Sequence, residues 1–126
     1  MKKHTIPFII LLFLLSSLTA CAEKEQMASG AKLINKDQFI FTASGEFKPF
    51  SYMNDDMTMT GFDIEVGEAI AEKLGLEPVQ KQMKFKGIVE GVKTGRADVA
   101  VASHTINEAR SKLVLFSTPH YNSGPQ

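Results

Sequence analysis

The clearest candidate for chemistry in this sequence is a cation placed near the start of a short predicted helix. Asn107 is expected to cap that helix, and Arg110 follows inside its first turn. A cation at this end opposes the helix dipole, which favours anions there. Free backbone N–H groups, the Thr105 hydroxyl and a guanidinium fork would together suit a carboxylate. The alternative is that Arg110 points into water, and spacing alone leaves both interpretations open.

Other kinds of chemistry have weaker support in the residue types. Asp55 and Asp56 are adjacent carboxylates, but they fall in a predicted turn and are expected to be solvated. The histidines, at positions 4, 104 and 120, do not have the spacing of a zinc-binding pair. The sequence shows no geometry for a Ser-His-Asp triad and no glycine-rich phosphate loop. We therefore expect no catalytic residue, no metal site and no cofactor.

The charge balance argues against a nucleic-acid partner. The 126 residues include 14 Lys and Arg against 14 Asp and Glu, so the formal net charge is zero. Phosphate binding needs an excess of positive charge on one face, and the basic residues here are scattered. The length suits one domain with a real core rather than two.

The first twenty-one residues have the pattern of an export signal. Lys2 and Lys3 precede an apolar run at residues 6–15, which is typical of a signal peptide. An uncleaved membrane anchor is the alternative, but spanning a bilayer takes about 20 apolar residues. Segment 18–21, Leu-Thr-Ala-Cys, resembles a bacterial lipobox, in which the cysteine becomes the lipidated first residue. That resemblance implies a diacylglyceryl and palmitate anchor on Cys21, which would hold the chain to a membrane.

The remaining chain divides into a tether and a folded region. We expect a signal peptide at 1–20, a lipidated N-terminus with a flexible tether at 21–36, and a binding lobe at 37–126. Strands are predicted at 39–42, 51–53, 77–83, 98–102 and 113–116, and helices at 63–74, 86–94 and 107–112. The alternation indicates an α/β domain, and the apolar run at 98–102 is typical of a buried parallel strand.

The first helix, 63–74, has the clearest periodicity. Asp63 is its expected N-cap and Gly75 its expected stop. Its inward face is expected to contain Phe62, Val66, Ala69, Ile70 and Leu74. In open α/β sheets ligands bind at the carboxyl ends of strands, which here directs attention to loops 44–49 and 103–107.

Several motifs in this order resemble the family 3 bacterial solute-binding proteins, which serve polar amino-acid ABC transporters. Segment 61–66, Gly-Phe-Asp-Ile-Glu-Val, is similar to the family signature. Segment 47–52 resembles an aromatic-x-Pro-Phe loop, and segment 83–88 resembles the stretch that supplies an aromatic wall. Further similar segments follow at 95–99, 105–110 and 116–121, so the likeness covers about residues 38–124.

The resemblance implies an amino-acid site. Arg110 would form a salt bridge with the α-carboxylate, and Thr105 would hydrogen-bond the same group. The Ser103 carbonyl would accept a hydrogen bond from the α-ammonium. Phe47 and Phe85 would sandwich the ligand side chain, although core packing remains an alternative for both rings.

Three positions depart from the family pattern or stand beside it. Ser44 occupies a place where many members have an aspartate that grips the ammonium or a cationic side chain. This weakens the case for a lysine, arginine or histidine ligand. Asn107 stands where threonine is usual, and it can still cap a helix. His104 is expected to be an exposed loop residue rather than a ligand.

The resemblance also implies that the chain ends early. Family members continue past a Tyr-x-x-Gly hinge into a second lobe, whereas here residues 121–124 are followed by two residues. The expected fold is therefore α/β, the first lobe of a type II periplasmic-binding-protein-like fold, truncated before the second lobe. The chain would be a fragment, a truncated gene product or a remnant. Because two lobes close around the ligand in such proteins, one lobe is expected to bind weakly or not at all.

The expected function is capture of a polar amino acid on the extracytoplasmic face of the cell membrane, for delivery to ABC transporter permease subunits. One alternative is an enzyme of the same fold, such as a dehydratase, which would need a general acid or base aimed into the cleft. Another is a receptor-kinase sensor module, which would need a downstream transmembrane helix. The last is a lipoprotein that serves only as a scaffold. The binding protein, not an enzyme, is the favoured interpretation.

Overall fold

The computed structural model describes residues 32–124, so the expected signal peptide, Cys21 and most of the tether lie outside the described residues. Its elements are, in chain order, β1 (Gln38–Ala43), β2 (Glu46–Phe47), β3 (Ser51–Met53), β4 (Met59–Thr60), α2 (Phe62–Leu74), β5 (Glu77–Gln82), the 3-10 helix η1 (Phe85–Gly87), α3 (Ile88–Lys93), β6 (Val99–Ala100) and α4 (Glu108–Ser111). No helix within this described stretch is long and apolar enough to span a bilayer.

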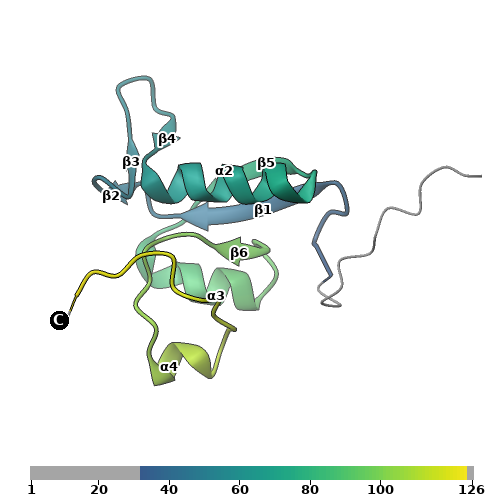
Figure 1. The fold of residues 1–126 in the computed structure, drawn as a ribbon, viewed down its shortest axis with the longest axis vertical. Helices are drawn as coiled ribbons and strands as arrows, with labels where there is room; N and C mark the ends of the chain where they lie inside the picture. Colours follow the sequence, from purple (N-terminus) through teal and green to yellow (C-terminus); the bar gives the residue numbers. More distant parts are fainter. Residues whose placement is uncertain (1–31, 125–126) are drawn as a thin grey trace, which may run out of the picture. The chain divides into compact units, whose positions relative to one another are not determined.

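A parallel sheet in the order β5-β1-β6 forms the centre of the lobe. The middle strand β1 is buried from Phe39 to Ala43, as expected for a strand with a neighbour on each side. Helix α2 packs along β1 and β5, while α3 packs beside β6 (Figure 1). Strands β2, β3 and β4 form a separate antiparallel sheet. The α/β class with parallel strands is thus confirmed.

Helix α2 buries a different face from the predicted one. Its buried residues are Asp63, Ile64, Gly67 and Ala71. Of the predicted inward residues, Val66 is partly buried against the core, whereas Phe62, Ala69, Ile70 and Leu74 are exposed. The reason is a close approach to β1: a Cβ on Gly67 would lie 2.6 Å from the ring of Phe41. Apolar periodicity favoured the large side chains, but the helix meets Phe41 through Gly67, where a larger residue would not fit.

Both ends of α2 can be compared with the prediction. Asp63 is not the N-cap, because Gly61 occupies that position and Asp63 lies inside the helix with 1% of its surface exposed. The predicted stop at Gly75 is confirmed. This glycine ends the helix in a left-handed conformation, with φ of 66°.

The last third of the lobe contains fewer strands than predicted. Segment 113–116 forms no strand, and only Val99–Ala100 of the predicted strand 98–102 pairs, with β1. Among residues 32–124, no strand pairs with the outer edge of β6. A strand needs a neighbour to complete its backbone hydrogen bonds, and segment 113–116 pairs with none of the described strands.

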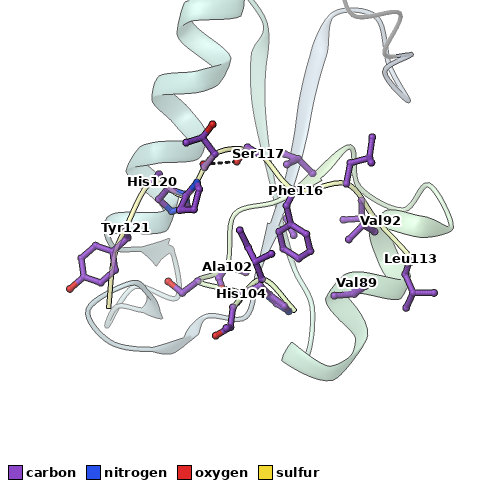
Figure 2. A pocket seen from close by; sticks show the side chains of 18 of the residues that line it. Val89, Val92, Ala102, His104, Leu113, Phe116, Ser117, His120 and Tyr121 are labelled. Atoms are coloured by element: carbon purple, nitrogen blue, oxygen red, sulfur yellow. Dashed lines mark hydrogen bonds between the residues drawn. The ribbon is translucent and has the colours of Figure 1, made fainter. Parts of the chain in front are cut away.

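A hollow of about 1160 Å³ separates segment 113–123 from β6 and α3. Figure 2 shows Phe116 pointing into this hollow, between Ala102 and His104 on one side and Val89 on the other. Its lining is largely apolar, with Val92 of α3 and Leu113 also facing it. The described lobe therefore has an uncovered apolar surface as well as an unpaired strand edge.

Candidate functional site

The parallel sheet brings three of the predicted site segments to one edge. Strands β1, β5 and β6 run in the same direction, so their carboxyl ends lie together. Ser44 directly follows β1, Phe85 comes shortly after β5, and Ser103 comes shortly after β6. This edge is where open α/β sheets hold their ligands.

Arg110 folds back over the loop that follows β6. The Asn107 side chain accepts a hydrogen bond of 2.9 Å from the Arg110 backbone N–H, which confirms the predicted cap. One guanidinium nitrogen donates to the Thr105 carbonyl at 2.8 Å, and the guanidinium carbon lies 5.8 Å from the centre of the Phe85 ring. Arg110 is half-buried, so it does not simply point into water. Among residues 32–124, no carboxylate forms a salt bridge with it.

His104 differs from the expectation of an exposed loop residue. It is half-buried, and its imidazole stacks on Phe85 with ring centres 4.3 Å apart and planes at 21°. Its Nδ1 lies 3.2 Å from the Ala102 carbonyl, to which the Nδ1–H tautomer donates. Burial, and then the charge of Arg110, lower the pKa of His104 below its usual 6.5. At pH 7 the imidazole is therefore neutral and adds no second cation beside Arg110.

The aromatic side chains predicted to flank a ligand are not core residues. Phe85 is 42% exposed and Phe47 is 51% exposed, which removes the alternative of core packing for both. Phe47 stacks on Phe50 with ring centres 5.1 Å apart. Both rings are therefore available to a ligand from their exposed sides.

Ser44 is less available than its predicted role requires. It is 5% exposed, its hydroxyl lies 3.4 Å from the Ser51 hydroxyl, and it accepts the Glu46 backbone N–H at 3.3 Å. Within the described stretch, no hydrogen bond or ring contact links Ser44 or Phe47 to Arg110. Their roles as ligand contacts remain predictions.

Ser103 is held in an unusual backbone conformation. Its φ is 49°, in the left-handed region, and its hydroxyl donates to Asp63 Oδ2 at 2.8 Å. Its carbonyl accepts no hydrogen bond from any other residue between 32 and 124. An acceptor thus lies two residues from Thr105, whose carbonyl already anchors Arg110.

The apolar hollow and the polar group around Arg110 are not the same site. Ser103, His104 and Thr105 line the hollow, but Arg110 and Phe85 do not. At about 1160 Å³ it also exceeds most small-molecule pockets, which measure about 300–1,000 Å³. A zwitterion needs charged and polar partners. We therefore place the candidate site on the rim of the hollow, at Arg110, Thr105, Ser103 and Phe85, which are called the Arg110 group below.

Comparisons with known proteins identify a matching family model and similar proteins. The family model for bacterial extracellular solute-binding proteins, family 3, matches residues 39–126. The L-cystine-binding protein TcyJ from Escherichia coli is 34% identical over 95 residues, covering 75% of this chain and 36% of the relative. Cyclohexadienyl dehydratase from Pseudomonas aeruginosa is 25% identical over 122 residues, covering 97% of this chain and 44% of the relative. The chain thus spans less than half the length of these relatives.

A solved structure bears on binding by one lobe. Domain 1 of TmArgBP, an arginine-binding protein from T. maritima, was crystallised in its arginine-bound form. It has a TM-score of 0.68 and 32% identity, with 70% of each chain covered. A single domain of that similar protein therefore takes an amino acid. Weak binding or none remains the prediction for this chain.

Proposed function

The chain belongs to the bacterial extracellular solute-binding proteins of family 3, and we propose that its described lobe binds the backbone of a polar amino acid at the Arg110 group. The observation that supports this most directly is a half-buried guanidinium with no carboxylate partner in the described part of the chain. A buried or half-buried charge is costly unless it is paired, and a ligand carboxylate is the partner that fits.

The remaining ligand contacts are assigned from the contact between Arg110 and the ligand carboxylate. The guanidinium N–H groups not used by the Thr105 carbonyl would bind the α-carboxylate as a fork, together with the Thr105 hydroxyl. The Ser103 carbonyl would accept from the α-ammonium. The exposed faces of Phe85 and Phe47 would flank the ligand side chain. This arrangement recognises the α-carboxylate and the α-ammonium that all amino acids share. The two aromatic rings would contact the part of the ligand that differs, its side chain.

For the whole protein we propose delivery of the amino acid to ABC transporter permease subunits on the extracytoplasmic side. A dehydratase is the second candidate, supported by the similarity to cyclohexadienyl dehydratase. That activity would need an acid or base facing the ligand. Asp63, the carboxylate nearest to Ser103, is only 1% exposed and is covered by the loop, so it is badly placed for this role. Binding is therefore the better supported function.

Binding can be tested on the full chain in a mild detergent by saturation-transfer NMR with each common amino acid. We expect one or a few polar amino acids to bind with a Kd between about 0.1 and 10 mM, because a similar single domain holds arginine, while an open lobe supplies few contacts against the cost of association. Absence of saturable binding in a folded chain would argue against the function. Binding at micromolar Kd or tighter would instead show that one lobe suffices and that the expected weakness is wrong.

The membrane anchor is a separate proposal, since Cys21 lies outside the described residues. We expect cells fed a clickable fatty acid to label the unsubstituted chain, because the lipobox pattern ends at this cysteine. Cys21→Ser should lose the label, whereas Ser16→Ala, which lies before the pattern, should keep it. Label retained on the Cys21→Ser chain would contradict lipidation at this position.

A further inference from the structure

Asp63 is a carboxylate enclosed at the start of α2. It is 1% exposed, and its backbone N–H donates to the Phe50 carbonyl at 2.8 Å, which fixes the first turn of the helix. The helix dipole favours a negative charge at this end. Because Asp63 is buried, any effect on binding must pass through the residues it holds.

One oxygen of Asp63 holds the loop that carries Ser103. The Ser103 hydroxyl donates to Oδ2 at 2.8 Å, across 40 residues of sequence. A left-handed conformation costs a non-glycine residue about 1–3 kcal/mol, and Ser103 has φ of 49°. A hydrogen bond to a carboxylate is about twice as strong as one between neutral groups, so this contact offsets the strain.

The other carboxylate oxygen, Oδ1, makes a purely structural role for Asp63 energetically unfavourable. Oδ1 is buried and has no hydrogen-bond partner among residues 32–124, and His120 Nε2 approaches it only to 3.8 Å. Burying an underpaired carboxylate destabilises a fold, so packing alone does not account for Asp63. Its charge lies one hydrogen bond from Ser103, where it also attracts a cationic group.

We propose that Asp63 is a positioning residue that holds the Ser103 carbonyl for the α-ammonium group of the ligand. Through that contact it sets the preference of the site for amino acids over carboxylic acids that lack the ammonium. This role rests on the proposed function, because the ammonium is assigned to the Ser103 carbonyl. It extends that function by naming a determinant outside the loop that touches the ligand.

The test compares two ligands on the full chain: the amino acid that binds best, and its desamino analogue, which has the same carboxylate and side chain. Asp63→Asn keeps the size and an acceptor oxygen but removes the charge, and Ser103→Ala removes the hydroxyl but keeps the carbonyl. Both should weaken the amino acid about tenfold and leave the analogue within about twofold, the scale of one charge-assisted hydrogen bond. Asp98→Asn is the control, since its carboxylate accepts the N–H groups of Ile34 and Ile40, 2.8 Å away each, and does not contact the loop.

Equal losses for both ligands would overturn the proposal, because a merely structural Asp63 weakens all binding alike. If Asp63→Asn does not fold, Ser103→Ala decides by the same ratio. If the unsubstituted chain binds neither ligand, the proposed function fails, and hydrogen-exchange mass spectrometry of segment 103–107 judges the positioning separately. Faster exchange in Asp63→Asn than in Asp98→Asn supports it, and equal exchange overturns it.

Discussion

Replacing Arg110 by alanine is expected to weaken amino-acid binding by this chain about thirtyfold. The guanidinium has no carboxylate partner in the described lobe, so its charge is available to the ligand. Losing one partner of a desolvated, hydrogen-bonded charge pair costs about 2–5 kcal/mol. Arg110 is only half-buried, so the lower end applies, about 2 kcal/mol or roughly thirtyfold in Kd. A Kd near 1 mM would then pass beyond detection.

Two variants show whether such a loss reflects the paired N–H groups of the Arg110 guanidinium or only its positive charge. Arg110→Lys keeps the charge but cannot bind a carboxylate with two parallel N–H groups, so an intermediate loss is expected. Lys112→Ala, at the C-cap of the same short helix, removes a cation that pairs with Glu108 at 2.7 Å with both side chains largely exposed. That pair contributes about 0–1 kcal/mol, and binding should not change. NMR titrations giving the same Kd for Arg110→Ala as for the unsubstituted chain would contradict the assignment.

The sheet was predictable because its signals are local. Strand formers at residues 39–42 and 77–83 and the apolar run after Asp98 gave the three parallel strands, although β6 is shorter than predicted. The segment at 113–116 has equally good strand formers and forms no strand. Pairing depends on a neighbour, and the space between this segment and β6 is a hollow. Local pattern cannot show whether a neighbour is present.

The prediction of the inward face of α2 was wrong for a different reason. Periodicity placed Phe62, Ile70 and Leu74 inward, yet the sheet is met by Gly67, whose missing Cβ leaves room for the ring of Phe41. The sequence did contain a signal for the face that is buried. Asp63, Gly67 and Ala71 recur every four residues, so an aspartate shares a face with small residues. That pattern is consistent with a close-packed helix and a buried carboxylate.

The candidate site was only partly predictable. The Asn107 cap follows from short-range spacing, and the structure shows it. Spacing alone left the direction of Arg110 open, and the structure places its guanidinium over the loop. The stacking of His104 on Phe85 and the bond from Ser103 to Asp63 join residues far apart in sequence. Such contacts depend on which strands are neighbours, and no local pattern records that order.

The largest effect on stability is expected at Gly61, where α2 begins. Its φ is 121° and its ψ 178°, a region that only glycine readily occupies. A Cβ at this position would lie 2.5 Å from the Phe50 carbonyl oxygen and 2.7 Å from that of Pro49. Both oxygens are fixed, because they accept the backbone N–H groups of Asp63 and Phe62. The strain and the clash therefore cannot be relieved without breaking the start of the helix.

Gly61→Ala should lower the free energy of unfolding by about 3 kcal/mol or more, since strain alone costs about 1–3 kcal/mol and the clash adds to it. Two other glycines separate these causes in urea denaturation. Gly95→Ala has φ of 72° but open space, so only strain remains, about 1 kcal/mol. Gly87→Ala has neither a positive φ nor a close neighbour and should be neutral or stabilising. A Gly61→Ala chain as stable as Gly95→Ala would mean that the loop at 49–50 yields, and that the start of α2 is not the rigid support that Asp63 and Ser103 require.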